Sequence, residues 1–156
     1  MRREDRQVKD INEIKDIIDH TMILHLGLFD GTYPYIVPLH YGYVYEGGFV
    51  FYMHCANEGH KLDLIQENPH VCIELENDME IVSGGDVPCK YGATFASVIG
   101  RGKVEIVEDV DEKIKGLKCL MKHQTGRDFE LNEQMANAVT VIKVTVEELT
   151  AKARKK

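Results

Sequence analysis

Residues 49–61, which read FVFYMHCANEGHK, organise the rest of the chain. The first five are mostly aromatic or β-branched and follow a glycine pair, which predicts a strand. A polar turn follows, and then a short helix is expected from Lys61 until Asn68 and Pro69 stop it. The first N–H groups of a helix lack partners and carry partial positive charge, so this arrangement favours anion binding. The stretch indicates a phosphate site in which His60 and Lys61 add donors and charge; the alternative is an ordinary turn with solvated basic residues.

The composition is typical of a soluble globular protein. The chain has 156 residues, of which 44% are hydrophobic and 29% charged, enough to build a real core. We expect one domain over residues 1–156, with a loose arm at 1–9 and a frayed basic tail at 151–156. The net charge of -7 argues against a general nucleic-acid binder, and no apolar run is long enough to span a bilayer. With no signal-peptide pattern and four scattered cysteines that we interpret as reduced thiols, we expect a cytoplasmic protein.

Hydrophobic periodicity predicts the elements on either side of residues 49–61. Strands are expected near residues 22–29, 35–45, 71–76, 93–107 and 139–146. Helices are expected after Asp10 and after Asp109, which can act as N-caps, and near residues 132–138. The first three strands have no crossover helix between them, so the pattern favours a mainly β (α+β) barrel over a doubly wound sheet. Residues 77–93 are irregular and glycine-rich, which fits either a lid or a surface excursion.

Two places in the predicted sheet are irregular. Pro38 lies inside the second strand and removes a ladder donor, so it marks an edge, a bulge or an opening of the sheet. Gly100 and Gly102 flank an arginine within an apolar strand. They do not open a helix, so we interpret them as a barrel corner rather than a nucleotide loop.

The histidines give a second candidate site. His40 lies in the second strand and His54 ends the third, so the two imidazoles would flank one cleft if these strands pair. The alternative is a pair of partly exposed strand histidines. No HxH or HExxH pattern and no converging ligand cluster occur, so we expect no metal site. Cys55 and His54 are poor candidates for a nucleophile–base pair, because neighbouring side chains along a strand point to opposite faces.

Taken together, the segments resemble the FMN-binding split-barrel family related to pyridoxamine 5'-phosphate oxidase, in particular its nitroimidazole-resistance (Nim) branch. The resemblance rests on LHLGLFDGTYPYIVPLHYGY at 24–43, FYMHCANEGHKLDLIQENPHVCIE at 51–74, SVIGRGKVEIVED at 97–109 and LMKHQTGRD at 120–128. The order and spacing of these segments cover nearly the whole chain. The substrate residues of true pyridoxamine phosphate oxidases are not recognisable, so that reaction is not expected.

The resemblance implies an FMN-binding split β-barrel of roughly six antiparallel strands, which forms a homodimer with FMN at the interface. It implies the following cofactor-binding residues: Val37, Pro38, Leu39 and His40 along the flavin ring, and His54, Cys55, Ala56, Gly59, His60 and Lys61 around the phosphate. The implied function is an FMN-dependent oxidoreductase of the nitroreductase type, acting on a small molecule such as a nitroaromatic compound, with His40 or His54 as the proton donor. The alternative is a non-catalytic protein that binds flavin or haem for storage or sensing. We expect no nucleic-acid partner and no membrane association.

Overall fold

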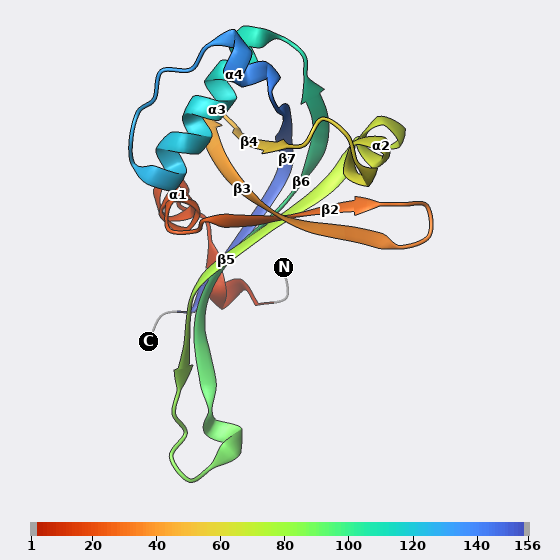
Figure 1. Ribbon diagram of the computed structural model, residues 1–156. Helices are drawn as coiled ribbons and strands as arrows, with labels where there is room; N and C mark the ends of the chain where they lie inside the picture. Colours follow the sequence, from red (N-terminus) through yellow and green to blue (C-terminus); the bar gives the residue numbers. More distant parts are fainter. Residues whose placement is uncertain (1–2, 155–156) are drawn as a thin grey trace.

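The computed structural model describes residues 3–154 and forms one antiparallel sheet that closes on itself (Figure 1). Its strands are β1 (Gln7–Val8), β2 (Ile23–Phe29), β3 (Pro34–Tyr45), β4 (Phe49–Cys55), β5 (His70–Val82), β6 (Gly92–Val107) and β7 (Thr140–Arg154). The order is β1-β7-β4-β3-β2-β5-β6, and β6 also pairs with β7. Six strands therefore close a barrel, and the short β1 adds a seventh beside β7. This confirms the predicted mainly β split barrel with few helices.

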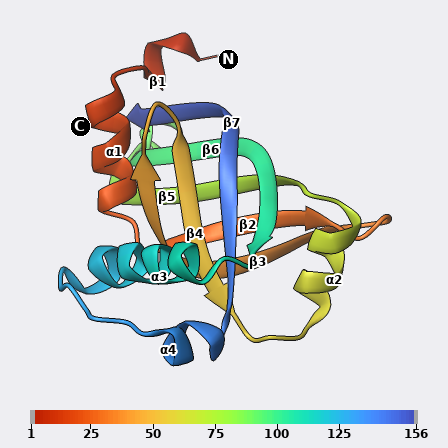
Figure 2. The same cartoon turned by 90° about the horizontal axis from the view of Figure 1, so that it is seen from above.

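Two helices cover the ends of the barrel and complete its core. The helix α1 (Ile11–Asp19) begins at Asp10, whose carboxylate accepts hydrogen bonds from two first-turn N–H groups at 2.9 and 3.0 Å. Its apolar stripe buries Ile14, Ile17 and Ile18. The helix α2 (His60–Glu67) follows the turn after β4 and buries three side chains. Both helices join the same core as the inward side chains of β2, from opposite sides of the barrel (Figure 2).

A third helix, α3 (Val110–Thr125), lies across the outer face of β3 and β4 (Figure 2). It is capped by Asp109, as predicted, and ends at Gly126, whose φ of 70° lies in the left-handed region. A Cβ on Gly42 in β3 would overlap the backbone of Cys119 and Leu120 in α3, so the helix can approach the strand this closely only over a glycine. The short helix α4 (Glu133–Asn137) follows and leads into β7.

The barrel is split along β3. Residues 34–40 of this strand pair with β2, and residues 41–45 pair with β4. Along residues 34–40, the edge of β3 that faces away from β2 therefore has no strand partner in the described chain. Pro38 lies within this open stretch, which agrees with two of the three alternatives expected for it, an edge or an opening of the sheet, and not with the third, a bulge.

The strand β5 is longer than predicted and forms a hairpin arm with β6, which has nearly the predicted bounds. We expected β5 to end at residue 76, but it continues through an irregularity between Asn77 and Glu80, while β6 begins at residue 92. Residues 83–91, which include the 3-10 turn η2 (Pro88–Lys90), form the tip. The arm projects from the barrel on the side away from α2 (Figure 1). Within this chain the arm is thus a surface excursion that stays clear of the β4–α2 turn.

Both ends of the described chain are paired more firmly than expected. Gln7 and Val8, which we placed in a loose arm, pair with β7 after the 3-10 turn η1 (Glu4–Arg6). The predicted frayed tail is wrong as far as residue 154, because β7 continues to Arg154 and pairs there with β6. Residues 1–2 of the predicted arm and residues 155–156 of the predicted tail lie outside the described chain. Within the described residues, no helix has the length and apolar character needed to cross a membrane.

Candidate functional site

The turn between β4 and α2 leaves helical N–H groups available. α2 begins at Gly59, whose φ of 139° lies in the region that favours glycine, and no described side chain caps the helix. The other α-helices are capped by side chains of Asp10, Asp109 and Asn132. The carbonyl of Gly59 accepts a backbone bond from Leu62 at 2.8 Å, which closes the first turn. The N–H groups of His60 and Lys61 are therefore the donors that this helix can offer to an anion.

A pocket of about 160 Å³ lies at this turn. It is lined by Tyr35, Cys55, Ala56, Glu58, Gly59, His60, Lys61 and Leu62. Five of the predicted phosphate residues, at 55, 56, 59, 60 and 61, thus surround one hollow. Drug-sized ligands occupy pockets of roughly 300–1,000 Å³, so this volume suits one small group, such as a phosphate.

Charge in the pocket favours an anion. Lys61 is half-buried at the start of α2, where the helix dipole adds partial positive charge. On α3, Lys122 pairs with Asp128 at 2.7 Å, whereas no described carboxylate pairs with Lys61. Glu58 also lines the pocket, but it is exposed and can turn its carboxylate to solvent. The Lys61 ammonium is therefore available to a bound group.

Tyr35 connects the pocket to the open edge of β3. Its ring meets the ring of His60 edge-on, with centroids 5.1 Å apart. Val37 and Leu39 lie further along the same strand with half-buried side chains that pack on the core, and Pro38 between them is exposed. The unpaired edge of β3 thus runs directly into the pocket. Sequence reasoning missed Tyr35, although it shares a strand face with Val37.

The two predicted histidines lie near each other on the outer face. The pairing of β3 with β4 ends at Tyr41 and Met53, and His40 and His54 are the residues next to that last pair on the two strands. Both are exposed. Partial burial of the ring lowers the pKa of His54, and the nearby His40 and Lys61 lower it further. The structure therefore brings His40, His54 and Lys61 into one neighbourhood.

One contact in this neighbourhood was not foreseen. The Nδ1 atom of His40 lies 3.0 Å from Oε1 of Gln124, in the last turn of α3. The two residues are 84 positions apart in the chain, so no local sequence pattern connects them.

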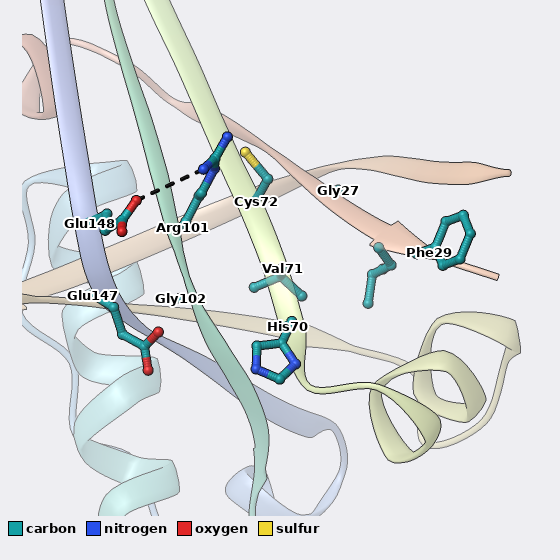
Figure 3. Close-up of a pocket in the computed structure, with 10 residues that line it drawn as sticks. Gly27, Phe29, His70, Val71, Cys72, Arg101, Gly102, Glu147 and Glu148 are labelled. Atoms are coloured by element: carbon teal, nitrogen blue, oxygen red, sulfur yellow. Dashed lines mark ion pairs between the residues drawn. The ribbon is translucent and has the colours of Figure 1, made fainter. Parts of the chain in front are cut away.

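A larger hollow of about 430 Å³ lies elsewhere, over β2, β5, β6 and β7 (Figure 3). His70, Cys72, Arg101 and Glu148 border it, and Arg101 and Glu148 pair across it at 3.9 Å. None of the predicted cofactor residues lines this hollow. Because its arginine already has a carboxylate partner, we take the smaller pocket with the uncapped helix as the candidate site.

The lowered pKa of His54 predicts a pH dependence of stability. In the folded chain His54 binds its proton more weakly than in the unfolded chain, whose histidines titrate near pH 6.5. Below about that pH the unfolded state therefore binds more protons than the folded state, so the free energy of unfolding falls as the pH drops. We expect the His54→Gln variant to lose less of its free energy of unfolding than the wild type between pH 7.5 and pH 5. Urea denaturation at several pH values measures this, with His70→Gln as the exposed control. An equal or larger acid loss in His54→Gln would contradict the prediction.

Comparison with known proteins adds the following findings. Residues 10–153 match a family model described as pyridoxamine 5'-phosphate oxidase. A crystal structure of a candidate 5-nitroimidazole antibiotic resistance protein from Bacteroides thetaiotaomicron is 32% identical, with a TM-score of 0.81 over 94% of this chain and 86% of that one. No curated protein matches the chain at a significant level.

More distant structures share the fold. A flavocytochrome from Azotobacter vinelandii is 19% identical, with a TM-score of 0.78 over 100% of this chain and 72% of that one. An FAD- and haem-binding protein from Mycobacterium smegmatis is 14% identical, with a TM-score of 0.80 over 97% of this chain and 74% of that one.

Proposed function

Because the chain belongs to the pyridoxamine 5'-phosphate oxidase family, we propose that it is a cytoplasmic FMN-binding flavoprotein that acts as an oxidoreductase of the nitroreductase type. The observation that carries the proposal is the uncapped N-terminus of α2, which opens into a small pocket beside Lys61. FMN ends in a phosphate, and free helical N–H groups with a nearby ammonium are the donors that a phosphate needs. The similar protein from Bacteroides thetaiotaomicron supports nitro compounds as the substrate class.

The residues present fit FMN in two parts. The pocket of about 160 Å³ suits the phosphate but is too small for a flavin ring, so the ring would lie outside it. The open edge of β3, which carries Val37, Pro38 and Leu39, leads away from the pocket and offers unpaired backbone groups to the polar edge of a ring. His40 and His54 would stand beside this edge. Cys55 and Ala56 add little side-chain bulk, which lets the backbone of the turn approach a phosphate.

In the proposed reaction, bound FMN supplies the redox chemistry by hydride or single-electron transfer. The chain holds the phosphate with α2 and Lys61, and it orients the ring along β3. Reduction of a nitro group consumes protons as well as electrons, so the site needs a group that can donate them. His40 or His54 would serve, because imidazole exchanges a proton near neutral pH.

We also propose that the protein is a homodimer with FMN at the interface. The outer face of the sheet exposes large apolar side chains, including Ile36 at 63%, Phe29 at 48% and Ile99 at 46%. Single apolar residues scattered over a surface need no explanation. These three side chains, however, project from β3, β2 and β6 on the same face of one sheet. A second copy that covered them would also shield a ring lying along β3.

The first test is the visible absorption spectrum of the purified protein during titration with FMN. We expect flavin bands that saturate at one FMN per chain, and a dimer by sedimentation. A Soret band would favour the haem-binding alternative, and the absence of any bound chromophore would overturn the proposal. Bound flavin that no chemical or nicotinamide reductant can reduce would favour a storage or sensing role.

The second test concerns the histidines. We expect His40→Ala or His54→Ala to keep FMN bound and to lose about 10²–10⁴-fold in the rate of nitro-group reduction, the range typical of a lost general acid. His70→Ala, at the larger hollow, is the matched control and should keep full activity. If His40→Ala and His54→Ala both retain full activity with FMN bound, neither histidine donates the proton.

A further inference from the structure

We infer that Gln124 keeps a proton on Nδ1 of His40 and so leaves Nε2 as the atom that exchanges protons, an inference that rests on the proposed role of His40. Gln124 would then be a positioning residue, acting through His40. It lies at the end of α3, outside the pocket and outside β3 and β4. The inference follows from the hydrogen bonds around its amide group.

The orientation of the Gln124 amide is determined by two backbone carbonyls. Its nitrogen donates to the carbonyl oxygens of Met22 at 3.0 Å and Tyr41 at 2.9 Å. A carbonyl oxygen can only accept, so the amide nitrogen must occupy this position, and its two hydrogens serve the two oxygens. The reversed amide would place three oxygen acceptors together without a hydrogen between them. The Oε1 atom must therefore face His40.

The tautomer of His40 follows from this orientation. Oε1 of Gln124 lies 3.0 Å from Nδ1 of His40, and an amide oxygen is only an acceptor. The bond can therefore form only when Nδ1 carries a hydrogen. Neutral His40 then has its lone pair on Nε2, and protonated His40 can give up the Nε2 proton without losing its bond to Gln124. The same relation between the two ring nitrogens governs histidines that act as acids, bases and metal ligands.

Gln124 is held in place by its own helix. The adjacent His123 lies with Nε2 at 2.8 Å from the carbonyl oxygen of Thr21, which ties the last turn of α3 to the segment before β2. The close approach over Gly42 fixes the middle of α3 against β3. The amide is thus supported by β3 and by the short connection between α1 and β2. Among titratable groups, His54 of β4 lies close enough to His40 to interact with it electrostatically, and Lys61 of α2 interacts with His54.

The test is nuclear magnetic resonance of protein labelled with ¹⁵N-histidine, with the His40 signals assigned from a His40→Asn variant. We expect the Nδ1–H tautomer of His40 in the wild type. Gln124→Met keeps the length of the side chain but removes the amide, and should shift the tautomer ratio toward Nε2–H by roughly fivefold to tenfold, the equivalent of one hydrogen bond. Gln134→Met, on the exposed side of α4, should leave the ratio unchanged.

Two results would overturn the inference: the Nε2–H tautomer in the wild type, or an unchanged ratio in folded Gln124→Met. If Gln124→Met does not fold, the wild-type spectrum alone decides. FMN binding is measured on the same samples by absorption. Failure to bind FMN would reject the proposed function while leaving the tautomer readable, so the two failures are distinguishable.

Discussion

FMN is expected to bind roughly tenfold to a hundredfold more weakly when Lys61 is replaced by alanine. A charge-assisted hydrogen bond contributes about 1.5–3 kcal/mol, and Lys61 lines the pocket without a carboxylate partner among the described residues. Riboflavin lacks the phosphate, so its affinity should change little. The loss should therefore appear in the ratio of FMN to riboflavin affinity, measured by quenching of flavin fluorescence.

The control is Lys90→Ala, which removes a lysine from the tip of the arm, away from α2. It should bind both flavins as the wild type does. If Lys61→Ala weakens FMN and riboflavin equally, the lysine acts on the ring or on the fold, and the assignment of the pocket to the phosphate is wrong. An unchanged FMN affinity would place the phosphate elsewhere.

Replacing Gly42 by alanine is expected to lower the free energy of unfolding by roughly 2–4 kcal/mol, the range of severe overpacking. The new methyl group would meet the main chain of Cys119 and Leu120, which cannot rotate away as a side chain can. α3 would have to move off β3, and Gln124 would move with it. Denaturant unfolding measures the loss of stability.

Gly48→Ala is the matched control, because a Cβ there meets no atom within 4 Å. Its stability should stay within about 0.5 kcal/mol of the wild type, as for most surface substitutions. A Gly42→Ala variant as stable as Gly48→Ala would mean that α3 lies further from the sheet than described here.

Sequence reasoning succeeded where local patterns decide structure. The stripe at Ile14, Ile17 and Ile18 and the cap at Asp10 specify α1 without help from the rest of the chain. It failed where pairing between distant segments decides. Val8 forms a strand only because Ala151 lies beside it, and β5 extends past Asn77 only because β6 pairs with it. Without these partner strands, such segments have no strong preference for a strand conformation, so the ends of the strands could not be predicted.

The candidate site shows the same division. Residues 55–61 are contiguous, and their turn, glycine and basic pair could be recognised together. Tyr35 and Gln124 reach the site from other elements. Both lie within segments that carry the family resemblance, at 24–43 and 120–128, but neither was singled out as a site residue. His40 and His54 lie between these cases, because their proximity depended on a single assumption, the pairing of β3 with β4.

The closure of the barrel by β7 has a consequence for biosynthesis. β7 pairs with β1, β4 and β6, all of which leave the ribosome before it. Until β7 has been made, β4 and β6 present open edges that no earlier segment covers in the finished structure, and pairing between such distant segments is slow. The turn before α2 also gains one of its contacts only when β7 has been made, because Asn57 accepts a hydrogen bond from Thr140 at 2.9 Å. We therefore expect that the proposed FMN would bind only after β7, which extends to residue 154, has been made, so the flavin would bind a closed barrel rather than guide its folding on the ribosome.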